Sequence, residues 1–198
     1  MAPPWCTDQR DGRTDPNPCL VSRDADGLRA AEPQHPVQDV DADTGRIEAV
    51  ELTGHETDDG SRVGPLLDQV TDPVASFTGD GAYDREGVYD AVADRHPEAA
   101  VVVPPRRDAV PSGTAETAPT RRDRHLRCIA ERGRLGWQKA SGYNRRALAE
   151  AAVSRYKRVI GDVLRSRTDP GRAVEVALAA RALKRMLELG RPESVRVA

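Results

Sequence analysis

The segment YNRRALAEAAVSRYK, residues 143–157, carries the pattern Tyr-x2-Arg-x3-Glu-x6-Lys and predicts an α-helix with two distinct faces. At about 100° per residue, the four pattern residues fall within an arc of roughly 60°, so they form one polar stripe. The opposite side is apolar and can be buried against a core. The stripe combines one acid with three groups suited to phosphate or base contacts: Tyr143, Arg146, Glu150 and Lys157. The apolar side consists of Leu148, Ala149, Ala152, Tyr156 and Val159.

A second motif, FTGDGAYD at residues 77–84, lies upstream at the end of a short apolar run. A strand that ends there places the Asp80 carboxylate at the rim of a sheet, and Gly81 lets a ligand approach closely. An aspartate in this position is also a common cap of the following helix. We expect Asp84 to fill that capping role, which leaves Asp80 available for chemistry.

The two motifs resemble the sequences around the catalytic acids of DDE transposases from bacterial and archaeal insertion sequences. The helical pattern is similar to the family's signature around its last catalytic Glu, and residues 77–84 are similar to its strand-end motif with the second catalytic Asp. The resemblance covers roughly residues 37–198. A solvated helix face with incidental ion pairs is the alternative, but four matched residue types at fixed spacing argue against it.

The resemblance implies DNA transposition, in which metal-dependent phosphodiester cleavage at transposon ends is followed by strand transfer. It implies Mg²⁺ or Mn²⁺ as the cofactor, with Asp80 and Glu150 as catalytic metal ligands. It also implies that Tyr143, Arg146 and Lys157 contact transposon-end DNA, by base stacking, a forked phosphate contact and a point charge. The implied partners are transposon-end and target DNA, with a homo-oligomer as the active form.

The family's first catalytic Asp lies on a front strand that reads roughly Val-Asp-Ser-Thr-Gly-Leu-Lys. Residues 23–29, RDADGLR, match it loosely, with Asp24 in the catalytic position. The distance along the chain from Asp24 to Asp41 is short for the family, and no apolar strand surrounds Asp24. Asp41 and Asp43 match a hairpin turn better than a catalytic site. We therefore expect the first strand and its Asp to be missing from a truncated or internally deleted copy.

Two regions are expected along the chain. Residues 1–36 are rich in Pro, Asp and Arg without a sustained period, so we expect irregular or poorly ordered structure. Residues 37–198 form the catalytic domain. The expected order is a hairpin within 37–53, a helix over 58–70, strands over 74–78 and 99–103 around a helix over 85–95, and helices over 120–132, 142–160 and 171–189. This α/β order, with the resemblance, implies a ribonuclease-H-like mixed sheet with flanking helices, incomplete at its first strand.

Charge is divided sharply along the chain, although the net charge is only −2. Residues 46–100 hold 4 basic and 13 acidic residues, whereas residues 101–198 hold 22 basic and 10 acidic residues. A basic half of this strength is typical of a nucleic-acid-binding protein. It could also fold against the acidic half, and both interpretations can hold together.

Several function classes are excluded by composition. Three scattered cysteines and four scattered histidines lack the spacing of a disulfide framework or a structural zinc site, and we expect the histidines to be ordinary surface or loop residues. No apolar run approaches the ~20 residues that span a bilayer, and the N-terminus does not match a secretory signal. We therefore expect a cytoplasmic protein without membrane contact. Trp137 is equally well suited to the core and to a DNA groove.

Two other functions remain open. The chain could be a non-catalytic DNA-binding remnant that competes for transposon ends or poisons oligomers of an intact enzyme. It could also be a hydrolytic nuclease on the same fold, although the stripe of residues 143–157 argues against this. The presence of a third carboxylate within reach of Asp80 and Glu150 separates the enzyme from the remnant.

Overall fold

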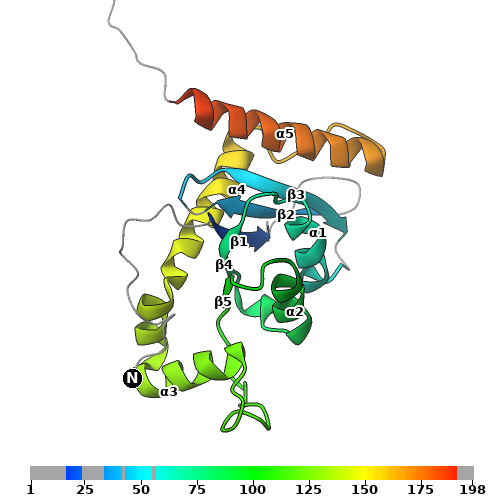
Figure 1. Cartoon of the computed structure of the whole chain (residues 1–198). Helices are drawn as coiled ribbons and strands as arrows, with labels where there is room; N and C mark the ends of the chain where they lie inside the picture. The colour runs from blue at the N-terminus through cyan, green and yellow to red at the C-terminus, as the bar shows by residue number, and fades with distance from the viewer. Residues whose placement is uncertain (1–16, 24–33, 42, 55–56, 191–198) are drawn as a thin grey trace, which may run out of the picture.

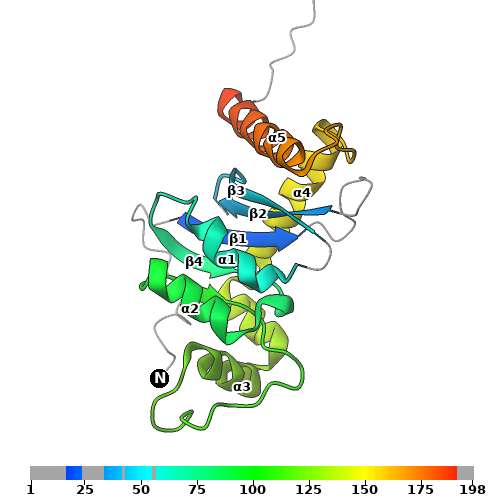
Figure 2. The same cartoon turned by 90° about the vertical axis from the view of Figure 1, so that its right-hand side faces the viewer.

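The computed structural model describes residues 17–23, 34–41, 43–54 and 57–190 of the 198. Its centre is a five-stranded mixed sheet in the order β3-β2-β1-β4-β5 (Figures 1 and 2). The strands are β1 Asn17–Arg23, β2 Gln34–Asp41, β3 Ile47–Gly54, β4 Val74–Thr78 and β5 Ala100–Val102. Strand β2 runs antiparallel to both of its neighbours, whereas β1, β4 and β5 are parallel. The predicted hairpin and the predicted strands over 74–78 and 99–103 are present.

Strand β1 corrects the expectation that the first strand is missing and that residues 1–36 are irregular throughout. It lies in the middle of the sheet, paired with β2 on one side and with β4 on the other. Its sequence, NPCLVSR, contains only a short apolar core, and its register shifts beside Pro18, which has no backbone N–H to donate. Pairing on both sides stabilises a strand that its own sequence indicates weakly. Asp24 and the rest of residues 24–33 lie outside the described residues.

Two short helices and their core cover one face of the sheet. The helices are α1 Val63–Leu67, which follows the 3-10 turn η2 Asp59–Arg62, and α2 Glu86–Arg95 (Figure 2). They pack apolar side chains against β4 and β5, with Phe77 at the centre and fully buried. The helices and the turn before α2 contribute these buried side chains to the core: Val63, Leu66, Leu67, Tyr83, Val88 and Val92. This packing fixes the position of the end of β4, two residues before Asp80.

The opposite face is covered by α4 Ala147–Val159 and α5 Asp169–Leu189 (Figure 1). Helix α4 contacts β1 and β2, and α5 contacts β3. In α4, Ala149, Ala152 and Tyr156 are buried as predicted, but Leu148 and Val159, at the edges of the predicted apolar side, are exposed. The stripe of residues 143–157 is thus carried on a helix whose inner side is anchored to the sheet.

Helix α3, Arg121–Ser141, packs beside the edge strand β5 and is bent at Gly133, whose φ of 71° lies in the left-handed region. The prediction of a helix over 120–132 therefore covered only its first part. Gly142, with φ 72°, ends α3 and leads into the 3-10 turn η4, Tyr143–Arg146, which runs directly into α4. The single helix predicted over 142–160 is a 3-10 turn joined to an α-helix.

Candidate active site

Asp80 lies two residues after the end of β4, at the rim of the sheet, as its sequence motif predicts. Its Oδ1 accepts a hydrogen bond of 2.8 Å from the backbone N–H of Ala82, so the side chain caps the short turn η3, Gly81–Tyr83. Its Oδ2 takes no part in this cap, and 38% of the side chain remains exposed. The preceding residue must be glycine, because a Cβ at Gly79 would lie 2.9 Å from the Tyr83 ring. Capping and a second role are therefore compatible at Asp80, since each uses a different oxygen.

Glu150 is in the first turn of α4, where the helix dipole favours a carboxylate. Its side chain is 56% exposed and points away from the buried side of the helix. The sequence between Gly142 and Ala147 contains no proline or β-branched residue that would interrupt the passage from η4 into α4. The η4–α4 junction therefore fixes the position of Glu150 relative to Arg146, one turn earlier.

Arg146 brings the two acids together. Its Nη1 lies 2.6 Å from Oε1 of Glu150, and its Nη2 lies 3.4 Å from Oδ2 of Asp80. Two carboxylates separated by 70 residues of sequence thus share one cation. Only 25% of the Arg146 side chain is exposed, so the group lies partly inside the site. This convergence is the arrangement that the two sequence motifs require if they belong to one centre.

Tyr143 forms one wall of the same site. Its ring centroid lies 5.3 Å from that of Trp137, and the residue is partly buried. Burial raises the pKa of Tyr143; Arg146 opposes this shift, and the carboxylates Asp80 and Glu150 add to it. The phenol is therefore protonated at neutral pH and can donate a hydrogen bond. Lys157 lies two turns beyond Glu150 on α4 and is partly buried.

The donor set suits a hard divalent cation. Carboxylate oxygens are the ligands that Mg²⁺ and Mn²⁺ prefer, and a cationic group already lies between Asp80 and Glu150. Within the described part of the chain, no cluster of three or more Asp, Glu, His or Cys residues is able to hold a metal. The described residues thus include two candidate ligands, and Asp24, the sequence candidate for a third, lies outside them.

Trp137 and His125 form a buried pair that supports this wall from behind. Trp137, 1% exposed, donates from Nε1 to Nδ1 of His125 at 2.9 Å, and Nε2 of His125 lies 2.7 Å from the carbonyl oxygen of Val101. The expectation that all histidines are surface or loop residues is wrong for His125, which is 4% exposed within α3. Of the two roles open to Trp137, the structure shows the core role. No signal in the sequence indicates this pair, because 12 residues and the bend at Gly133 separate the two side chains.

Asp84 is a structural residue, and the prediction that it caps the next helix is wrong. The N-cap of α2 is Arg85. The Asp84 side chain is completely buried and accepts two hydrogen bonds from Arg122, from Nε at 2.8 Å and Nη2 at 3.1 Å, and one of 3.0 Å from the backbone N–H of Arg106. Of the two carboxylates in the FTGDGAYD motif, Asp84 is therefore buried and links α3 to the loop after β5, whereas Asp80 stays accessible.

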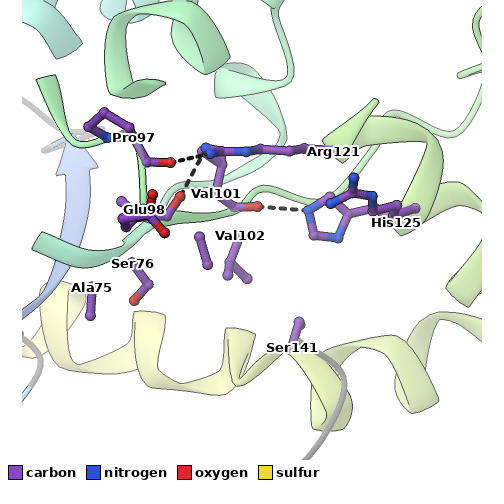
Figure 3. Close-up of a pocket in the computed structure, with 12 residues that line it drawn as sticks. Ala75, Ser76, Pro97, Glu98, Val101, Val102, Arg121, His125 and Ser141 are labelled. Atoms are coloured by element: carbon purple, nitrogen blue, oxygen red, sulfur yellow. Dashed lines mark hydrogen bonds between the residues drawn. The ribbon is translucent and has the colours of Figure 1, made fainter. Parts of the chain in front are cut away.

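A separate pocket of about 590 Å³ lies between the outer side of β5 and α3 (Figure 3). Arg121 donates to the carbonyl oxygens of Pro97 and Ala99, and His125 lies against that of Val101, so both polar side chains are used to cover the edge of the sheet. The pocket contains neither Asp80 nor any residue of α4. It is therefore distinct from the candidate active site.

A comparison with known protein families identifies the family of the chain. The model of the transposase DDE domain family matches residues 35–187, which include both acids and every helix of the described structure up to the last turn of α5. The chain belongs to the transposase DDE domain family. DDE domains act on DNA in transposition and generally use divalent metals, as the sequence resemblance implied. The family match begins after β1, so it does not include Asp24. In the described residues, no helix is both long and apolar enough to cross a membrane.

Proposed function

We propose that this transposase DDE domain cleaves phosphodiester bonds at transposon ends and carries out strand transfer, with Asp80 and Glu150 as the metal-binding carboxylates. The observation that carries the proposal is their convergence on Arg146 from the end of β4 and the start of α4. The strand order β3-β2-β1-β4-β5, with β2 alone reversed, supports assignment of the sheet to the ribonuclease-H-like class. The active form is proposed to be a homo-oligomer on DNA.

The reaction consists of two displacements at phosphorus. In the first, a water oxygen bonds to phosphorus, the P–O3′ bond breaks and a 3′-hydroxyl is released. In the second, that hydroxyl attacks a phosphorus of the target and displaces the target's own 3′-oxygen. Divalent cations supply activation of the attacking oxygen and stabilisation of the leaving oxygen.

The residues of the chain position the DNA for these steps. The Tyr143 ring, held by Trp137, offers a face for base stacking beside the acids. Arg146 can fork onto a phosphate, and Lys157 contributes a point charge farther along α4. All three lie on η4 and α4, so they are presented by one rigid segment packed against the sheet.

The first prediction concerns the acids. Glu150→Gln and Asp80→Asn are each expected to reduce Mn²⁺-dependent nicking of DNA by at least about a hundredfold, because a neutral amide cannot replace a charged metal ligand. DNA affinity measured without metal should be preserved or slightly increased. Glu188→Gln on α5, another ion-paired surface acid, is the matched control and should cut normally. Normal nicking by both active-site variants would contradict the proposal.

One observation favours the alternative of a non-catalytic remnant that binds transposon ends. In the described residues only two acids converge, and no third joins them. Asp24→Asn separates the two functions. If the wild-type protein nicks DNA and Asp24→Asn does not, the chain is an enzyme that uses Asp24. A wild-type protein that binds transposon ends but never nicks DNA with Mg²⁺ or Mn²⁺ is the remnant.

A further inference from the structure

Arg146 occupies the place where a cation is needed. Its guanidinium contacts one oxygen of each acid, 2.6 Å from Glu150 and 3.4 Å from Asp80. Two carboxylates that face a common space repel each other unless positive charge lies between them. The arginine supplies this charge from within the chain, so the two acids can be held together without a metal.

The fit of the arginine is incomplete. The contact with Asp80 is long, and Nε of Arg146 is buried without a hydrogen-bond partner in the structure. The pair with Glu150 is an i,i+4 pair on a side chain that is 56% exposed, a type of contact that stabilises a helix only slightly. A buried, unsatisfied N–H also favours any rearrangement that gives it an acceptor. The contacts that hold Arg146 are therefore weak enough to be exchanged.

We propose that Arg146 is an internal counter-ion that competes with divalent cations for Asp80 and Glu150. Metal binding releases the guanidinium from the two acids, and a DNA phosphate then provides its next partner. The inference rests on the proposed function in so far as that function assigns the metal to these acids. It adds that one residue links metal binding to DNA binding, and that the metal-free protein holds its site closed with its own cation.

Charge balance gives the direction of the exchange. The two carboxylates carry two negative charges, so one divalent cation neutralises them and leaves the guanidinium without its partners. A forked contact to a phosphate oxygen pair then suits the planar guanidinium better than the single long contact to Asp80. If metal binding strengthens DNA binding by freeing Arg146, then by thermodynamic linkage DNA binding must strengthen metal binding by the same factor.

The test measures Mn²⁺ affinity in the absence of DNA, by calorimetry or by the electron paramagnetic resonance of free Mn²⁺. Arg146→Ala and Arg146→Gln are both expected to bind Mn²⁺ about three- to tenfold more tightly than wild type, because the ion pairs between Arg146 and the two partly exposed carboxylates no longer have to be broken. Thermal unfolding of each variant checks that it is folded. If two folded variants bind Mn²⁺ as weakly as wild type, or more weakly, the inference is wrong.

Arg145→Ala is the matched control. Arg145 is the adjacent arginine, and it pairs with Asp43 rather than with either acid. Its removal changes the net charge by the same amount but should leave Mn²⁺ affinity within about twofold of wild type, because the exposed charge is screened by solvent and salt. An equal gain in Arg145→Ala would show that only general electrostatics is involved, which would also overturn the inference.

The outcomes distinguish this inference from the proposed function. If Mn²⁺ binding is lost in Glu150→Gln but unchanged in Arg146→Ala, the proposed metal site is supported and competition between Arg146 and the metal is refuted. No measurable Mn²⁺ binding in wild type, Arg146→Ala or Arg146→Gln refutes both. Tighter binding in both Arg146 variants, together with loss of binding in Glu150→Gln, supports both.

Discussion

His125 shows how a single side chain can be tied to one protonation state. Because the Trp137 indole can only donate, Nδ1 of His125 must accept, and the proton lies on Nε2, which donates to the carbonyl of Val101. Burial lowers the pKa of His125, while the hydrogen bond to Val101 opposes this shift. A second proton on Nδ1 would face the indole N–H and break the link between the two halves of α3.

The stability of the protein should therefore fall in mild acid. The folded-state pKa of His125 is below its unfolded value of about 6.5, so the unfolded chain binds a proton that the folded chain does not. The contribution is complete above the unfolded pKa and is lost as pH falls toward the folded pKa, at up to about 1.4 kcal/mol per pH unit. Chemical denaturation at pH 8, 7, 6 and 5.5 measures this slope. His125→Gln, which keeps the other three histidines, should flatten it, and an unchanged slope would assign the effect elsewhere.

Asp80, Asp84 and Glu150 illustrate which residue roles the sequence could predict. Its motifs placed Asp80 at the sheet rim and Glu150 on the exposed side of a helix, and both placements agree with the structure. They could not reveal that Arg146 touches both acids, because that contact joins segments 66 residues apart. Nor could they show that Asp84 is buried on Arg122, since burial depends on packing that a local pattern does not encode.

Among the secondary-structure elements, α3 has the most strongly defined beginning. Thr120 and Asp123 form a capping box, and Asp123 also accepts two hydrogen bonds of 2.7 Å from the backbone N–H and hydroxyl of Ser112. Burial alone would raise the pKa of Asp123, but the hydrogen bonds from Ser112 and Thr120 hold it far below its ordinary value. The cap thus fastens the loop after β5 to the first turn of α3.

Replacing this cap should weaken the whole domain. Asp123→Ala is expected to reduce the free energy of unfolding by about 1–2 kcal/mol, because it removes the helix cap and the acceptor of four hydrogen bonds from Ser112 and Thr120. Urea denaturation at neutral pH measures the loss. Asp108→Ala, an exposed aspartate in the same loop, is the control and should change stability by less than about 0.5 kcal/mol. Equal effects in the two variants would refute a special role for the cap.

Strand β1 and helix α5 mark the limits of prediction for whole elements. The short apolar core of β1 is stabilised by two partner strands, one of which lies more than fifty residues away in sequence. In α5, Val174 and Leu178 are both 58% exposed, whereas Val176 and Ala180 are buried. The helix is rich in apolar residues on every side, so its sequence does not define which side meets the sheet.

At the scale of the whole molecule, the acidic and basic halves are intermixed by folding. Ion pairs join them at Asp84 and Arg122, at Glu48 and Lys184, and at the candidate active site. Internal complementarity therefore accounts for part of the charge division seen in the sequence. Further basic residues on η4 and α4, Lys157 among them, lie on the same segment as Glu150, where a DNA backbone is proposed to bind.

The salt dependence of DNA binding tests this distribution. Lys157→Ala should weaken binding to DNA and reduce the magnitude of the slope of log K against log[salt] by about 1, as expected for one lost phosphate contact. Arg185→Ala, a change of equal charge on the solvent side of α5, should leave the slope unaltered. Fluorescence anisotropy at several salt concentrations measures both. Identical slopes for wild type and Lys157→Ala would remove Lys157 from the interface.

The account depends on a shared metal site at Asp80 and Glu150, and a crystal of the protein grown with Mn²⁺ tests this directly. The predicted result is anomalous density for Mn²⁺ at about 2.1 Å from oxygens of both carboxylates, on one ion or on two ions ~4 Å apart, with Arg146 moved away from them. Saturating Mn²⁺ that binds elsewhere, while both acids remain paired with Arg146, would contradict it.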